Sequence, residues 1–125
     1  MAIAFAKNLS LVCIGAGPVT VYTDPIPLGG NDRLFCITNV HYLQTSSALG
    51  APQVDFVAQL SNDGGATYVD STTVLDTLVA AGLSQVTGAC SAAVLRIRFR
   101  LSNPMAAATD ISSCSLDLHV NADKT

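Results

Sequence analysis

The stretch Leu95-Arg96-Ile97-Arg98-Phe99-Arg100-Leu101 decides the fold class. Apolar and basic residues alternate in it without a break, which is the period of a β-strand with one dry face and one wet face. Its four apolar side chains are predicted to point into a core, and its three arginines are predicted to point outward. Half of the chain's six basic residues therefore share one strand face.

The composition around this strand favours an all-β protein. The chain has 125 residues, of which 50% are hydrophobic and 12% are charged, so it can bury a sizeable core and is not expected to be disordered. It contains no glutamate and only two lysines. Because Glu, Lys and Arg are common surface residues of helices, few amphipathic helices are expected.

Turn signals rich in Gly, Pro, Asn and Ser divide the chain into about eight expected strands. The segment 71–90 is undecided between a short helical turn and an irregular crossing, with a short strand at 85–87. The spacing predicts an all-β, jelly-roll-like antiparallel β-sandwich with little or no helix. We expect an apolar N-terminal arm over residues 1–8 and a single sandwich domain over residues 9–125.

The last two expected strands suggest a pairing. If residues 111–121 form an antiparallel pair with the arginine strand, Asp117 would lie opposite or diagonal to Arg96 or Arg98. A single aspartate cannot neutralise three arginines, so part of the positive row would be left for solvent or for a partner. The row is either a solvated face that prevents aggregation or a contact surface, since arginine is enriched at interfaces.

Several functional classes are not expected. The net charge of −3 argues against nucleic-acid binding, and no apolar run approaches the roughly 20 residues of a membrane span. In the N-terminal segment, Lys7 follows the apolar residues, which is the reverse of a signal peptide, so synthesis in the cytoplasm is expected. In that compartment Cys13, Cys36, Cys90 and Cys114 are expected to be buried thiols, although one or two disulfides remain an alternative.

No motif predicts a cofactor, a metal site or catalysis. The run Cys13–Pro18 contains Gly-Ala-Gly, but an extended β-branched segment follows where a nucleotide-binding loop needs a helix. The four cysteines form no close pair for zinc, and His41 and His119 are the only imidazoles. We expect a non-enzymatic protein without a small-molecule substrate.

The segment Ser61–Tyr68 resembles the Asp-box that caps hairpins in sialidase-like propellers. Only one copy is present, whereas a propeller needs several blades. The structural interpretation is a hairpin turn held by Asp63 and made possible by Gly64 and Gly65.

Three segments carry a resemblance to a known class of proteins. They are Leu-Ser-Asn-Asp-Gly-Gly-Ala-Thr-Tyr at 60–68, Val-Leu-Arg-Ile-Arg-Phe-Arg at 94–100 and Ser-Leu-Asp-Leu-His-Val at 115–120. In style, over most of its length, the chain resembles the small jelly-roll decoration (cement) proteins of tailed-bacteriophage capsids.

The resemblance implies a homotrimer on the capsid surface of the virion that bridges subunits of the major capsid protein. The residues implied to bind this partner are those of the arm and of the arginine row: Ile3, Phe5, Lys7, Arg96, Arg98 and Arg100.

Two alternatives remain open at this point. Another phage structural role, in a tail or neck, would use the same fold with a different partner. A carbohydrate-binding β-sandwich module would need exposed aromatic side chains, and the chain has no Trp and only three tyrosines, Tyr22, Tyr42 and Tyr68.

Overall fold

The computed structural model describes the backbone of residues 2–48 and 50–125 and the side chains of residues 6–48 and 50–125. Over these residues it contains strands and no helix, and so no helix that could cross a membrane. The strands are β1 (Ala2–Ile14), β2 (Val19–Tyr22), β3 (Ile26–Pro27), β4 (Arg33–Thr45), β5 (Gln53–Ser61), β6 (Val69–Leu78), β7 (Gly82–Ala89), β8 (Val94–Ser102) and β9 (Ile111–Asp123).

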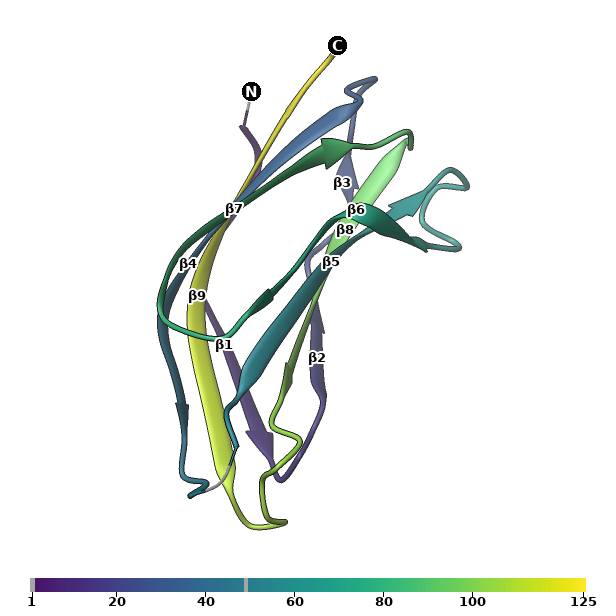
Figure 1. Ribbon diagram of the computed structural model, residues 1–125. Helices are drawn as coiled ribbons and strands as arrows, with labels where there is room; N and C mark the ends of the chain where they lie inside the picture. Colours follow the sequence, from purple (N-terminus) through teal and green to yellow (C-terminus); the bar gives the residue numbers. More distant parts are fainter. Residues whose placement is uncertain (1, 49) are drawn as a thin grey trace.

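The strands form two antiparallel sheets packed face to face (Figure 1). Sheet A has the order β1-β9-β4-β7, and sheet B has the order β2-β8-β5-β6, with the short β3 also paired to β8. The last strand, β9, lies between the first strand, β1, and β4 from the middle of the chain. This strand order is that of a jelly roll. The predicted fold class is confirmed, and the two-residue β3 accounts for the ninth strand.

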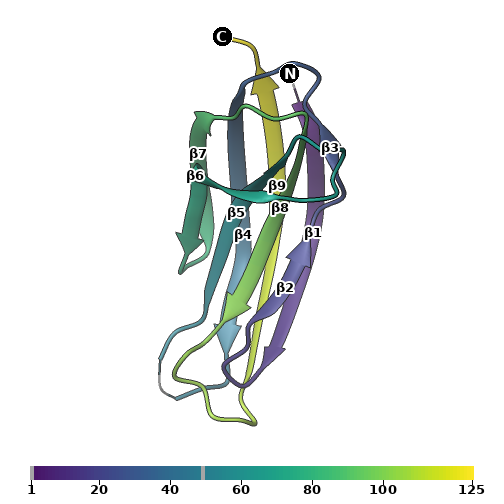
Figure 2. The same cartoon turned by 90° about the vertical axis from the view of Figure 1, so that its right-hand side faces the viewer.

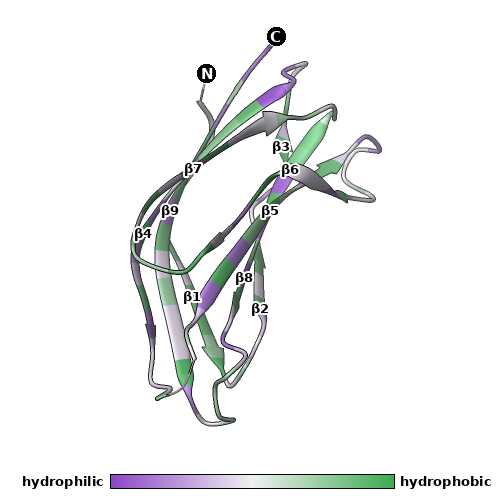
Figure 3. Cartoon of the chain, viewed as in Figure 1, coloured by the Kyte–Doolittle hydropathy of each residue, from purple (hydrophilic) through white to green (hydrophobic). Residues whose placement is uncertain are grey.

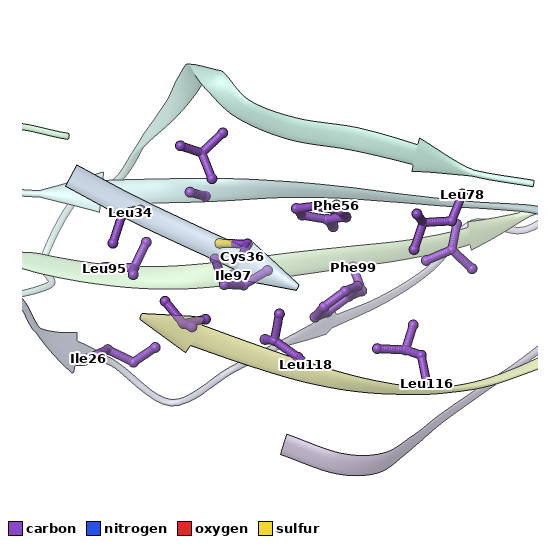
Figure 4. Packing of buried hydrophobic residues seen from close by; sticks show 14 of the residues in the cluster. Ile26, Leu34, Cys36, Phe56, Leu78, Leu95, Ile97, Phe99, Leu116 and Leu118 are labelled. Atoms are coloured by element: carbon purple, nitrogen blue, oxygen red, sulfur yellow. The ribbon is translucent and has the colours of Figure 1, made fainter. Parts of the chain in front are cut away.

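The core lies between the sheets, and the arginine strand lies at the centre of sheet B (Figure 2). The four alternating apolar residues of β8 from Leu95 to Leu101 are fully buried, as predicted, and they face the inward side chains of β9 (Figure 4). Phe99 packs against Phe56 of β5 with ring centroids 5.9 Å apart. All four cysteines are buried free thiols.

The expected pairing of the last two strands is wrong. The neighbours of β8 are β2, β3 and β5 in sheet B, whereas β9 lies between β1 and β4 in sheet A. Asp117 consequently faces away from the arginines and accepts hydrogen bonds on the other sheet, from the backbone N–H of Asn8 at 2.8 Å and from His41 Nε2 at 3.0 Å. Alternation assigns the side chains of a strand to faces, but it does not assign the strand to a sheet.

Residues 71–90, left undecided by the sequence, form most of two edge strands. β6 lies at one edge of sheet B, β7 lies at one edge of sheet A, and the turn between them carries the chain across the sandwich. Val74 and Leu78 of β6 point into the core. Asp76 accepts a 2.7 Å hydrogen bond from Ser84 Oγ, which ties the two edges together.

The N-terminal segment is part of β1 from Ala2 onward. β1 pairs with β9 from Ala2 to Ile14, with an irregular register between Ala6 and Leu9. Asn8 at this irregularity has a φ of 55°, a left-handed conformation that asparagine tolerates better than most residues. The boundary expected after residue 8 therefore coincides with a bulge inside a continuous strand.

Candidate partner-binding surfaces

The residues expected to bind a partner are not gathered on one surface. Lys7 lies on β1 in sheet A, whereas the arginines lie on β8 and face outward from sheet B. Lys7 and the arginines therefore lie on strands of different sheets, β1 and β8 (Figure 1). The pKa of Asp117 is lowered first by hydrogen bonds from the Asn8 backbone N–H and from His41, and the charge of Lys7 adds to this effect. Ile3 and Phe5 lie in β1, but their side chains are outside the described residues.

The three arginines differ in their surroundings. Arg96 lies between two tyrosine rings, with its guanidinium carbon 4.1 Å from the centroid of Tyr22 and 4.0 Å from the centroid of Tyr68. Arg98 forms an ion pair with Asp70 at 3.3 Å. Arg100 is exposed on the same face.

Only part of this row is free to meet a partner. Arg98 is the register partner of Val57 on β5, and Val57 is buried although it points outward. A hydrogen bond from Gln59, followed by the positive charges of Arg98 and Arg100, lowers the pKa of Asp70. The acid that balances the row thus comes from β6 and not from β9.

The hairpin between β5 and β6 is closed by its own side chains. Asp63 accepts a hydrogen bond from the backbone N–H of Thr67 at 2.9 Å and from Ser61 Oγ at 2.7 Å, and its carboxylate is also bound by Thr67 Oγ1. Gly64 and Gly65 have φ angles of 74° and 92°, which side chains rarely adopt. Every polar contact of this carboxylate lies within the turn, so its role here is structural.

A surface that the sequence did not reveal is the C-terminal half of β1. Val12 and Ile14 are 57% and 70% exposed on the outer face of sheet A, and Ile111 of β9, also exposed, is the register partner of Ile14. Hydropathy colouring shows the apolar end of β1 (Figure 3). The sequence did contain a signal for this surface, because residues 11–14 are all apolar. Successive residues of a strand point to opposite faces of the sheet, so two of these four side chains had to lie on the outer face.

A second apolar patch lies at the turn between β6 and β7, where Leu75, Val79 and Leu83 are exposed. This patch belongs to the opposite edge of the sandwich from β1. Among the described residues, no group of three or more His, Cys, Asp or Glu side chains is placed to hold a metal ion.

No family model and no curated protein matches the sequence. Among solved structures, the chain is similar to the CBM22-1–GH10 modules of Clostridium thermocellum endo-1,4-β-D-xylanase 10B, which were crystallised with xylohexaose. The TM-score is 0.35 at 8% identity, and the match covers 78% of this chain but only 18% of the xylanase chain. A match at this level assigns neither a family nor a function.

Proposed function

We propose that the chain is a non-enzymatic structural protein of a phage virion, which decorates the outside of the capsid by binding the major capsid protein. The observation that carries the proposal is the open apolar edge of β1. Among the described strands, β1 pairs only with β9, so its other edge presents unpaired backbone N–H and C=O groups.

The C-terminal half of β1 has none of the features that normally protect a sheet edge. Charges, prolines and bulges block strand addition, and in β1 both Lys7 and the bulge at Asn8 fall in the N-terminal half. Residues 9–14 carry no charge and no proline, and Val12 and Ile14 are exposed beside the free edge. Such a segment suits the addition of a strand from a partner.

The other three sheet edges are better protected. β6 carries Asp70 and Asp76, and the short β2 lies between Pro18 and Pro25. β7 has only eight residues, begins with a glycine and contains a second one at Gly88. These contrasts favour β1 as the docking edge.

This function would require only binding to the shell and no chemical reaction. A decorating protein that bridges neighbouring shell subunits stabilises the assembled state by mass action, and many copies add their effects. A homotrimer would place three β1 edges around one symmetry axis of the shell. The jelly roll is a fold used by viral capsid proteins, which is compatible with this role.

The test is co-sedimentation of the purified chain with undecorated heads of the phage that encodes it. Ile14→Lys places a charge on the exposed apolar edge, where it should abolish binding without unfolding the chain. Thr87→Lys is the matched control, because it places the same charge on an exposed position of β7. Equal binding by both variants, or no binding by the unmodified chain, would overturn the proposal.

A further inference from the structure

Arg96 is held on three sides by groups from three different parts of sheet B. Tyr22 at the end of β2 covers one face of its guanidinium, and Tyr68, just before β6, covers the other. Its Nε donates a 2.7 Å hydrogen bond to Gln59 Oε1 on β5. Only the edge that carries the two Nη groups is left for another contact.

The charge of Arg96 is not balanced by a nearby acid. Among the described residues, the ion pairs are Arg33–Asp123, His41–Asp117 and Arg98–Asp70, and none includes Arg96. Asp70 is occupied, because it accepts a 2.8 Å hydrogen bond from Gln59 Nε2 and pairs with Arg98. A half-buried guanidinium without a counter-ion is costly to maintain, so a ligand that supplies the missing negative charge would be favoured.

The shape of the free edge selects the ligand group. A guanidinium presents parallel N–H donors in a plane, which match the two oxygens of a carboxylate. Because tyrosine rings cover both faces of the Arg96 guanidinium, an anion can approach it only in the plane of the guanidinium. The rigid stack also removes the entropy that a free arginine would lose on binding.

The surroundings of Tyr22 indicate which kind of molecule the carboxylate ligand should be part of. Tyr22 remains 47% exposed, and it lines a hollow of about 400 Å³ between β1 and β2–β3. The hollow is also lined by apolar Leu9 and Ile26 and by Asp24. Asp24 is exposed and makes no hydrogen bond or ion pair with another described residue, so its carboxylate is available to accept hydrogen bonds.

We propose that this surface binds an acidic saccharide. The carboxylate of a uronic or sialic acid would occupy the fork of Arg96, a neighbouring sugar unit of the same saccharide would pack on the exposed side of Tyr22, and hydroxyls of that unit would donate to Asp24. The hollow beside Tyr22, which Arg96 itself does not line, has a volume within the range of small-ligand sites, about 300–1,000 Å³. The fork of Arg96 lies on sheet B, whereas the hollow is also lined by Leu9 of β1, which belongs to the docking edge proposed above. The saccharide proposal makes no use of the unpaired backbone groups of β1, so it does not depend on the proposed function.

The experiment is calorimetric titration of the full chain with trigalacturonic acid and 3′-sialyllactose, with galactotriose and lactose as neutral controls. The acidic sugars should bind and the neutral ones should not, and added salt should weaken binding because the contact is ionic. Arg96→Lys keeps the charge but loses the planar fork, and it should weaken binding roughly tenfold or more. Arg33→Lys, a cation over Phe35 on the other sheet, is the matched control and should bind like the unmodified chain.

A second readout keeps the proposal testable if Arg96→Lys is unstable. In the unmodified protein, the Arg96 Nε–H signal in a ¹⁵N–¹H spectrum should shift when the acidic sugar is added, and the Arg33 signal should not. No heat and no shift with either acidic sugar would overturn the site. Equal binding of triglutamate would overturn its assignment to a saccharide and would indicate a protein carboxylate as the ligand.

Discussion

Replacing Phe99 with alanine tests whether the core lies between the two sheets. Phe99 is fully buried at the centre of β8, and its ring lies 5.9 Å from that of Phe56 at an interplanar angle of 42°. The aromatic pair faces Leu116 and Leu118 of sheet A (Figure 4). Truncating Phe99 removes one of the two aromatic rings from this contact and leaves a cavity.

The expected cost follows from the burial. A buried phenylalanine replaced by alanine destabilises a protein by about 3–5 kcal/mol. With about 2.1 cal/mol/K of unfolding entropy per residue, the 125-residue chain has an unfolding entropy of about 0.26 kcal/mol/K. The melting temperature of Phe99→Ala should therefore fall by about 11–19 °C.

Thermal melts followed by circular dichroism measure this shift, and Phe35→Ala provides the control. Phe35 is half-buried on the outer face of sheet A, where the guanidinium carbon of Arg33 lies 5.2 Å from the ring centroid. Its removal should cost about 1 kcal/mol, or about 4 °C. If the melting temperature of Phe99→Ala fell no further than that of Phe35→Ala, the assignment of Phe99 to the inward face of β8 would be refuted.

Three further predictions concern other parts of the fold. Burial raises the pKa of Cys36 to about 12 and that of Cys114 to about 11, so a colorimetric thiol reagent should react with neither at about pH 8 until the chain is unfolded. Hydrogen bonds, first from Thr67, lower the pKa of Asp63, so its carboxylate stabilises the fold above about pH 4 and loses this effect as the pH falls. In calorimetry, Asp63→Asn should melt below the unmodified chain at pH 7, and the gap should narrow by about pH 2. Gly88→Ala should cost about 1–3 kcal/mol in urea unfolding, because its Cβ would lie 2.7 Å from a threonine hydroxyl of β6.

The fold class and much of the core could be predicted because alternation reports burial directly. The inward residues of β8 and the inward run of β9 were both assigned correctly from period two. What alternation does not report is the partner of a strand. In the jelly roll, β9 returns to pair with β1, so two strands adjacent in sequence belong to different sheets.

The edge strands were the hardest to predict. In β6, the polar and apolar residues follow no clean period, because Ser71 is buried while Leu75 is exposed. Ser71 Oγ accepts hydrogen bonds from the backbone N–H groups of Thr73 and Val74, so this strand is shaped by local side-chain contacts. Such contacts depend on the final geometry and leave no pattern in the sequence.

The candidate sites were only partly predictable for the same reason. The outward direction of the arginine row followed from the sequence. The rings that stack on Arg96 come from Tyr22 and Tyr68, which lie far apart along the chain, so their contact could not be predicted. The tyrosines were counted in the sequence as too few for a sugar-binding surface. Pairing of β2 with β8 and closure of the β5–β6 hairpin bring two of the three to the same side chain.

Amide hydrogen exchange of the chain, free and bound to phage heads, tests the docking edge most directly. If a partner strand adds to β1, the amides of residues 9–14 that point to the free edge should exchange rapidly in the free chain and become protected in the complex, whereas the alternate amides already pair with β9. The peptide covering β7, at the opposite edge of the same sheet, should not change. A stable complex in which residues 9–14 exchange as fast as in the free chain would contradict the account.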